Sequence, residues 1–283
     1  MPLLNTLLRS DSPKLARPVK GLVGFVMQKS HLFQNVRIRR DGYLLPFHSG
    51  SNVALTYWIV PELVDPTEVF VRSLLRPGDV FVDVGANVGT ISALAAGLVG
   101  ETGRVVAIEP HPTTFAYLQR TISSNELKNV VCLERACGSA AGVTGLTNQR
   151  RKDDNNRVDA AGSGLSVRVT TLASVLRDLS LDSVSLLKID VEGFEGAVLR
   201  GLADEASRVA ALYVEVIEAN TQRFGDSVSS ITTMLQTLGF SCFRSAADAT
   251  NLVALTRLDQ LTAIGGGAWE PVAGNPPLGA NRL

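Results

Sequence analysis

The chain has 283 residues, 45% of them hydrophobic, and its 27 basic side chains balance its 27 acidic ones. This length and apolar content suit one large soluble domain with a short N-terminal extension better than two full domains. Without an excess of positive charge, a nucleic-acid partner is not expected and a small-molecule partner is. The three cysteines show neither a disulfide framework nor zinc-ligand spacing, which indicates a cytoplasmic protein.

Residues 1–64 differ in pattern from the rest and are expected to form an N-terminal extension of helices and a strand. Apolar residues recur at helical spacing between positions 3 and 26, interrupted by Pro13 and Pro18, which predicts one or two short amphipathic helices. We interpret the extension as a lid over a ligand cleft, with a homo-oligomer contact or attachment to a membrane surface as alternatives. No apolar run is long enough for a transmembrane segment, and no signal peptide is evident. The basic residues that follow are interpreted as a solvated face: Arg37, Arg39 and Arg40.

From residue 65 to residue 262 the sequence predicts alternating helices and strands. Asp65 is expected to cap a helix that begins at Pro66, and two short apolar runs stop at Asp83 and at Glu109. Further strands are expected at 130–133, 186–189, 212–216, 240–243 and 252–255. A helix is expected between each pair of successive strands except the last two, which are expected to form a closing antiparallel hairpin. This order predicts a doubly wound α/β fold.

Two stretches lack this regularity. The polar run 149–157 and the glycines that follow it are interpreted as a solvated surface loop or hairpin tip, or alternatively as a loop that overhangs the acceptor site. Val167 and Val169 alternate with polar residues, which predicts a strand that returns the chain to the sheet. Thr171 is expected to cap the helix that follows. Residues 263–283 contain many glycines and prolines and are interpreted as a flexible or draped C-terminal tail.

The first strand leads into a glycine turn of the kind that binds nucleotides. Gly85 and Gly89 after Asp83 allow a tight turn close to a ligand. Glu109 lies 20 residues beyond Gly89, where a carboxylate can accept hydrogen bonds from ribose hydroxyls. Asn87 replaces a glycine of the dinucleotide fingerprint, and no Walker pattern is present. The expected ligand is therefore an adenosine derivative without a phosphate chain.

The charge at this turn favours S-adenosylmethionine as the cofactor. Its sulfonium and α-ammonium groups would be attracted by the carboxylate of Asp83, which would repel a pyrophosphate. The alternative interpretation is that Asp83 only caps the following helix. Two other functions also stay open at this point: an NAD(P)-dependent oxidoreductase and a non-catalytic module that binds the cofactor.

A second group of acidic residues follows the strand at 186–189. Asp190 and Glu192 come just after that strand and Glu215 ends the next one, so all three are expected at the carboxyl edge of the sheet. Carboxylates gathered in one cleft need a cation, which Lys188 or the sulfonium can provide. We interpret the three acids as candidates for the general base or for orienting an acceptor hydroxyl. Their oxygens could also bind Mg²⁺, but no spacing defines a site, so the metal is left unassigned.

Together these segments resemble the FkbM family of S-adenosylmethionine-dependent methyltransferases. The resemblance extends from about Asp65 to Leu255. The segments that carry it are Asp-Val-Gly-Ala-Asn-x-Gly from Asp83, Glu-Pro at 109–110, Asn125, Thr-Leu at 171–172 and Lys-Ile-Asp-Val-Glu-Gly-x-Glu from Lys188. The resemblance implies the class I methyltransferase (Rossmann-like) fold, a doubly wound seven-stranded sheet whose last strand is antiparallel. It also implies O-methylation of a hydroxyl on a sugar, a glycolipid or a polyketide-like natural product.

The resemblance also implies which residues contact the cofactor. Those expected at its methionine end are Asp83, Gly85, Ala86, Asn87 and Gly89. Glu109, with Pro110 beside it, is expected at the ribose. The chain departs from the family pattern at Ala173, where an acid is common, and a clear acidic contact for adenine is missing around Ala136 and Cys137.

Overall fold

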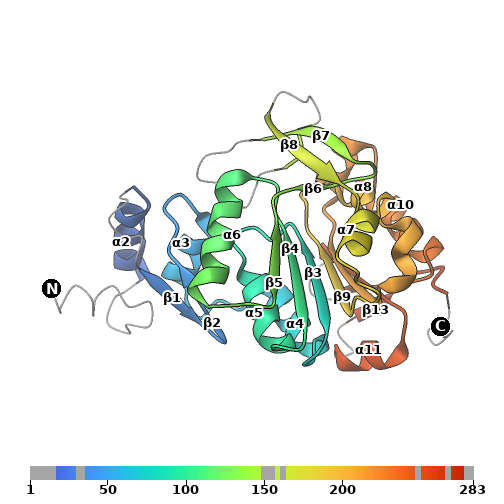
Figure 1. Cartoon of the computed structure of the whole chain (residues 1–283), viewed down its shortest axis with the longest axis horizontal. Helices are drawn as coiled ribbons and strands as arrows, with labels where there is room; N and C mark the ends of the chain where they lie inside the picture. The colour runs from blue at the N-terminus through green and yellow to red at the C-terminus, as the bar shows by residue number, and fades with distance from the viewer. Residues whose placement is uncertain are drawn as a thin grey trace.

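The computed structural model describes residues 17–29, 36–147, 157–159, 164–245, 250–264 and 269–276. One large sheet forms the centre of these residues, with a two-stranded sheet at its N-terminal side and a three-stranded sheet near the carboxyl ends of its parallel strands (Figure 1). No helix within these ranges is both long and apolar enough to cross a membrane.

The large sheet has the strand order β13-β11-β12-β10-β9-β3-β4-β5. Its strands are β3 (Val80–Val84), β4 (Arg104–Ile108), β5 (Val130–Leu133), β9 (Leu186–Ile189), β10 (Ala211–Glu215), β11 (Ser241–Ser245), β12 (Asn251–Leu255) and β13 (Trp269–Pro271). The five strands from β5 to β10 are parallel, whereas β12 is antiparallel to both β10 and β11. The predicted doubly wound sheet with an antiparallel last strand is confirmed, and β13 adds a further edge strand.

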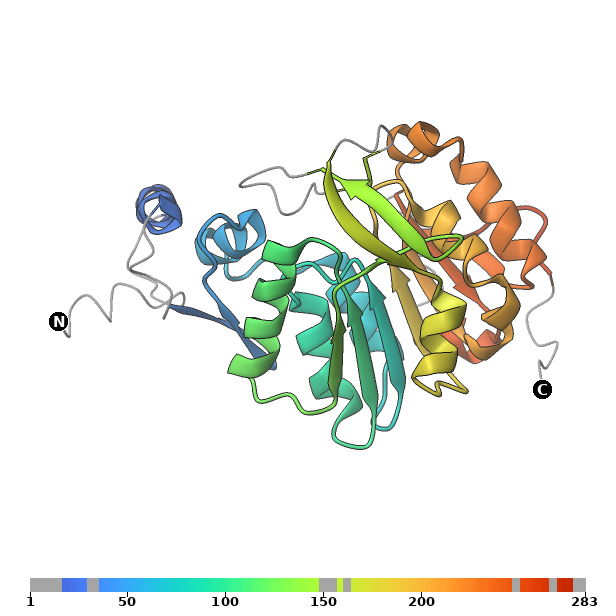
Figure 2. The ribbon, with the colours of Figure 1, turned by 45° about the horizontal axis from the view of Figure 1, so that its top comes forward.

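Helices cover both faces of this sheet because its strands carry apolar side chains on both sides (Figure 2). They are α4 (Pro66–Leu74), α5 (Thr90–Val99), α6 (Pro112–Ser124), α7 (Leu172–Asp178), α8 (Glu195–Arg200), α9 (Glu218–Thr221), α10 (Val228–Thr237) and α11 (Leu258–Ala263). Along β3, Val82 and Val84 belong to the hydrophobic cluster that includes residues of α7, α8 and α10, and Phe81 belongs to the cluster that includes residues of α4 and α5. The strand order changes direction at β3, which has β4 on one side and β9 on the other, and ligands bind at such switch points.

The helix caps predicted from the sequence are present. Asp65 accepts a hydrogen bond from the N–H of Thr67 at 2.8 Å, and Thr171 accepts one from the N–H of Ser174 at 3.1 Å. Each cap satisfies a backbone donor that the first helical turn leaves without a partner. The starts of α4 and α7 are thus determined by local sequence.

The N-terminal extension packs against α5 and α6 through a separate hydrophobic cluster. Its elements are α2 (Arg17–Lys29), β1 (Arg37–Arg40), β2 (Tyr43–Pro46) and α3 (Asn52–Ile59). The prediction that Arg40 lies on a solvated face is wrong. Both oxygens of the buried Glu68 carboxylate accept hydrogen bonds from Arg40 at 3.0 Å, and its guanidinium lies 4.0 Å from the centre of the Tyr57 ring. A carboxylate buried among aromatic side chains requires such a counter-ion.

The strand predicted around Val167 does not join the large sheet, which corrects that expectation. It is β8 (Leu165–Thr170), and it pairs with β6 (Ala136–Cys137) and β7 (Gly142–Leu146) in the order β6-β8-β7. Polar and apolar residues alternate along β8, so only one of its faces is apolar, whereas a strand inside the parallel sheet is covered on both.

Residues 269–276, part of the tail predicted to be flexible or draped, lie along the edge of the large sheet. β13 pairs with β11, and the ring of Trp269 lies 5.8 Å from that of Phe70. The side chain of Asn275 exchanges two hydrogen bonds of 2.7 Å with the backbone of Cys242. These contacts cover the edge of β11, which would otherwise offer unpaired backbone groups.

Candidate active site

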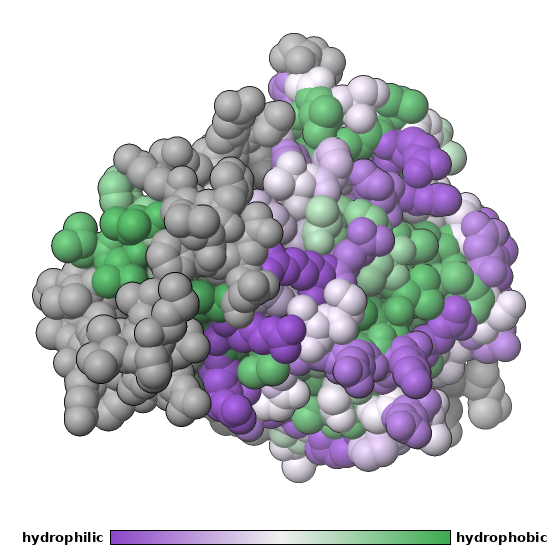
Figure 3. All heavy atoms as spheres, turned by 60° about the vertical axis from the view of Figure 1, so that its left-hand side comes forward, coloured by the Kyte–Doolittle hydropathy of each residue, from purple (hydrophilic) through white to green (hydrophobic). Residues whose placement is uncertain are grey.

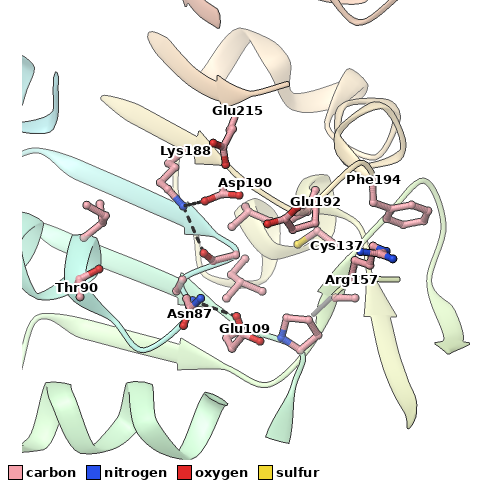
Figure 4. A pocket seen from close by; sticks show the side chains of 18 of the residues that line it. Asn87, Thr90, Glu109, Cys137, Arg157, Lys188, Asp190, Glu192, Phe194 and Glu215 are labelled. Atoms are coloured by element: carbon pink, nitrogen blue, oxygen red, sulfur yellow. Dashed lines mark hydrogen bonds and ion pairs between the residues drawn. The ribbon is translucent and has the colours of Figure 1, made fainter. Parts of the chain in front are cut away.

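A cavity of about 260 Å³ lies at the carboxyl ends of β3, β4, β9 and β10 (Figure 4). It is lined by these predicted site residues: Gly85, Ala86, Asn87, Glu109, Pro110, Asp190, Glu192 and Glu215. Asp83 and Gly89 do not line it. The two sequence segments that were predicted to meet at this edge of the sheet therefore do meet.

The turn after β3 lies against the turn after β9, and glycine is required for this approach. Gly85 has a φ of 82°, and a Cβ atom built on it would lie 1.8 Å from the carbonyl oxygen of Asp190. Asn87 also has a positive φ, of 50°, which asparagine tolerates better than most residues. The backbone N–H of Asn87 donates to Oε2 of Glu109 at 3.0 Å, so the turn is joined to the end of β4 as well.

Glu109 is held by the backbone rather than by a cation. Its two carboxylate oxygens accept hydrogen bonds from the N–H groups of Asn87, at 3.0 Å, and His111, at 2.9 Å. Burial raises the pKa of Glu109 to about 7, although these two hydrogen bonds oppose the shift. Each carboxylate oxygen can accept a further hydrogen bond, so two neighbouring hydroxyl groups of a ligand could bind here.

Asp83 occupies a different position from the one expected. Its side chain is fully buried behind the glycine turn, where Oδ2 accepts a hydrogen bond from Oγ of Ser92 at 2.6 Å. Oδ1 lies 3.3 Å from Nζ of Lys188. The direct attraction between Asp83 and a sulfonium in the cavity is therefore not supported, because Lys188 already compensates this charge.

Lys188 connects the two turns (Figure 4). Its Nζ lies 3.2 Å from Oδ2 of Asp190 and 3.3 Å from the carbonyl oxygen of Gly85, in addition to its contact with Asp83. Burial lowers the pKa of Lys188, but the charges of Asp190 and Asp83 outweigh burial and raise that pKa. Lys188 therefore stays protonated and fixes the position of Asp190.

Asp190 and Glu215 lie next to each other in the cavity wall but differ in their partners. Asp190 pairs with Lys188, whereas the pKa of Glu215 is raised to about 9 by the charge of Asp190, by burial and by a hydrogen bond between the two carboxyl groups. Glu215 therefore keeps its proton at neutral pH and donates that hydrogen bond. Two neighbouring carboxyl groups with different partners, one of them with a raised pKa, are suited to different chemical roles.

The turn after β9 is shaped by a residue that sequence reasoning did not single out. Glu195, at the start of α8, accepts hydrogen bonds from the N–H groups of Val191, at 3.3 Å, and Gly193, at 2.9 Å. Gly193 has a φ of 111°, and a Cβ atom there would lie 2.5 Å from the carbonyl oxygen of Asn220. Nδ2 of Asn220 donates to Oε2 of Glu192 at 2.9 Å. The signal in the sequence was the second glutamate of the Lys-Ile-Asp-Val-Glu-Gly-Phe-Glu segment.

Several cavity residues come from outside the predicted motifs. On one side they are Val53 and Tyr57 of α3 with Asp65 and Thr67 at the start of α4. At the other end they include Arg135 and Arg157, which form no ion pair with any described carboxylate. Arg157 is the last residue of the polar run predicted as a loop, and it lines the cavity. The rest of that run, residues 149–156, lies outside the described residues, so the alternative that it overhangs the site stays a prediction. These contacts join distant parts of the chain and have no local sequence signature.

The cavity does not contain a recognisable metal centre. Within the residues that the structure describes, no three His, Cys, Asp or Glu side chains converge in a way that could hold a metal ion. The Mg²⁺ hypothesis is thus not supported, since Lys188 already neutralises Asp190. His48 stacks on Tyr117 at 4.3 Å, and burial lowers its pKa to about 3. Neither His48 nor His111, which caps α6, lines the cavity.

The strand order, the glycine turn after β3 and the acidic residue after β4 define the class of S-adenosylmethionine-dependent methyltransferases with a Rossmann-like fold. The sequence profile of the methyltransferase FkbM domain matches residues 83–242, which is more than half of the chain. The protein belongs to this FkbM methyltransferase family. This result overturns the alternative of an NAD(P)-dependent oxidoreductase.

Named relatives have modest sequence identity to the chain. The chain is 27% identical to the 31-O-demethyl-FK506 methyltransferase FkbM of Streptomyces tacrolimicus, and the match covers 67% of this chain and 82% of that protein. It is 26% identical to the hexuronic acid methyltransferase AglP of Haloferax volcanii, with coverage of 56% and 65% respectively. A solved structure of an FkbM methyltransferase from Methylobacillus flagellatus is 16% identical, with a TM-score of 0.42 and coverage of 71% of this chain and 52% of that one.

Proposed function

We propose that the protein transfers the methyl group of S-adenosylmethionine to a hydroxyl oxygen of a sugar, a glycolipid or a polyketide-like natural product. The main supporting observation is the pair of carboxyl groups in one cavity wall, Asp190 held by Lys188 and Glu215 with a raised pKa beside it. The names of two relatives, which refer to a hexuronic acid and to FK506, favour oxygen-rich acceptors of these kinds.

The residues that line the cavity fit this cofactor. Glu109 would accept hydrogen bonds from the ribose hydroxyls with its remaining lone pairs. The turn at Gly85, Ala86 and Asn87 would hold the methionine end, and no side chain at position 85 blocks the backbone. When bound, the cofactor supplies an electrophilic methyl group on a positively charged sulfur.

The chain's own contribution is to position an acceptor hydroxyl and to take up its proton. Asp190 is the proposed acceptor of that proton, and its contact with Lys188 holds the carboxylate in place. Protonated Glu215 donates a hydrogen bond to Asp190 and so fixes the direction of its free lone pairs. Glu192, held by Asn220, is proposed to orient the rest of the acceptor.

The cofactor proposal is tested by calorimetry with S-adenosylmethionine, S-adenosylhomocysteine and NAD. We expect binding of the first two compounds and no binding of NAD. Tight NAD binding without any response to S-adenosylhomocysteine would reject the proposed cofactor site. Methyl transfer from labelled S-adenosylmethionine onto a panel of glycosides, glycolipids and polyketides then identifies the acceptor class.

The role of Asp190 is tested by the Asp190→Asn variant. It keeps the shape of the side chain, so we expect S-adenosylhomocysteine to bind nearly as before while turnover falls by a factor of about 10² to 10⁴. Asp182→Asn, on an exposed aspartate paired with Arg208, is the matched control and should leave turnover unchanged. Turnover of Asp190→Asn at the level of this control would remove Asp190 from the chemistry.

A further inference from the structure

Helix α2 is apolar on two opposite faces. Its inner face packs on α3, where a Cβ atom built on Gly24 would lie 2.6 Å from Cδ1 of Leu55, and Met27 is fully buried. Its outer face carries Leu22, which is 67% exposed, and Val26, which is 51% exposed, four residues apart. The view of this side of the molecule shows hydrophobic side chains grouped at the surface (Figure 3). Apolar groups of this kind on a surface indicate an interaction site.

The segment that contains α2 is strongly basic. Residues 1–40 hold eight lysines and arginines, of which Arg40 is paired with the buried Glu68, and one acidic residue, Asp11. The remaining 243 residues hold 19 basic and 26 acidic ones. The net charge of the whole chain is zero because a positively charged N-terminal segment is balanced by a negatively charged remainder. α2 itself has no acidic residue. Two copies of this segment would repel each other, whereas a surface of negative charge would attract it.

We propose that α2 docks on an anionic lipid surface. A helix with exposed apolar residues and basic residues in the same segment has the properties of an interfacial helix: the apolar side chains enter the region between headgroups and acyl chains, and the charges attract anionic lipids. The docking does not depend on the proposed methyl transfer. It agrees with a peripheral contact, since no described helix could cross the bilayer.

The position of α2 links this contact to the cavity. α3 supports α2 through Leu55 and lines the cavity with Val53 and Tyr57. Both α2 and α3, each about 10 Å thick, therefore lie between the docking surface on the outer face of α2 and the cavity. On the proposed function, this arrangement favours a glycolipid over the other acceptor classes, because a lipid-anchored sugar would be presented beside the cavity.

The docking is tested with the full-length protein and vesicles. Vesicles of phosphatidylcholine mixed with phosphatidylglycerol should sediment the protein at low salt, and vesicles of phosphatidylcholine alone should bind at least about tenfold less. Raising the salt concentration should weaken the binding, because exposed charges are screened. Equal binding to both vesicle types, or no binding to either, would overturn the proposal.

Two variants locate the contact on α2. Leu22→Asp combined with Val26→Asp changes only exposed positions and should reduce vesicle binding at least about tenfold, with binding of S-adenosylhomocysteine unchanged. Val143→Asp is the control, since Val143 is 69% exposed on β7, and it should bind vesicles like the unchanged protein. Undiminished binding of the double variant would overturn the proposal. Light scattering adds a further test: a dimer that dissociates in the double variant would assign α2 to self-association instead.

Discussion

Lys188 is the residue on which the charge balance of the cavity depends. It is buried, and it contacts the side chains of Asp83 and Asp190 and the backbone of Gly85. Removal of a buried charge leaves its partners uncompensated in a medium of low polarity, which costs more than the pair contributes. One side chain therefore supports both the glycine turn and the proposed proton acceptor.

We expect Lys188→Met to lower the free energy of unfolding by about 3–5 kcal/mol, measured by urea denaturation. Arg72→Met is the control, because the partner of Arg72, Asp41, is 91% exposed, and it should cost less than about 1 kcal/mol. Addition of Asp190→Asn to Lys188→Met should restore part of the loss, since it removes one uncompensated charge. Equal losses for Lys188→Met and Arg72→Met would contradict this account.

Glu215 should make stability depend on pH. Its pKa is raised from 4.5 to about 9, so the folded state holds the proton more tightly than the unfolded state does. The resulting stabilisation is complete below pH 4.5 and is lost as the pH rises to about 9. Glu215→Gln cannot titrate, so its free energy of unfolding should fall less over this range than that of the unchanged protein. Denaturation at several pH values checks this, and parallel curves would refute it.

The turn after β3 and the turn after β9 lie against each other in the wall of the cavity. This contact limits which residues position 85 can accept. Gly85→Ala would place a methyl group against the carbonyl oxygen of Asp190 and would also strain a positive φ. We expect loss of S-adenosylhomocysteine binding and a destabilisation of at least about 2 kcal/mol more than in Gly225→Ala. Gly225 is the matched control, because its φ is 78° but its Cβ position is open. Calorimetry and denaturation distinguish the two effects, and similar behaviour of both variants would show that only φ matters.

The N-terminal hairpin is coupled to the cavity through Arg40, Glu68 and Tyr57. Arg40→Met would leave Glu68 buried without its counter-ion and Tyr57 without the guanidinium on its ring. Because Tyr57 lines the cavity on α3, we expect KM for the acceptor to rise about tenfold, with little change in the Kd of S-adenosylhomocysteine. Arg72→Met, which loosens the same hairpin from its exposed side, should leave both constants unchanged. A larger change in the Kd than in the KM would place Tyr57 at the cofactor instead.

At the level of elements, the features that could be predicted were those determined by residues that are adjacent in the sequence. Apolar runs that stop at an acid located β3, β4 and β9, and the caps Asp65 and Thr171 located two helices. Ion pairs between residues far apart in the sequence, such as Arg40 with Glu68 or Lys188 with Asp83, have no local sequence pattern and could not be predicted. For the same reason the burial of Asp83 and the separate β6-β8-β7 sheet were missed, since both depend on tertiary neighbours.

For the whole molecule, the order of the strands means that the two neighbours of the central strand β3 are synthesised at different times. β3 pairs with β4, which follows it closely, and with β9, which begins only at residue 186. During synthesis on the ribosome, the chain has therefore made β3, β4 and β5 long before β9 can close the second side of β3. During that interval the mostly apolar strand Val80–Val84 has one row of backbone groups unpaired, and such a strand is prone to aggregation and to binding by chaperones.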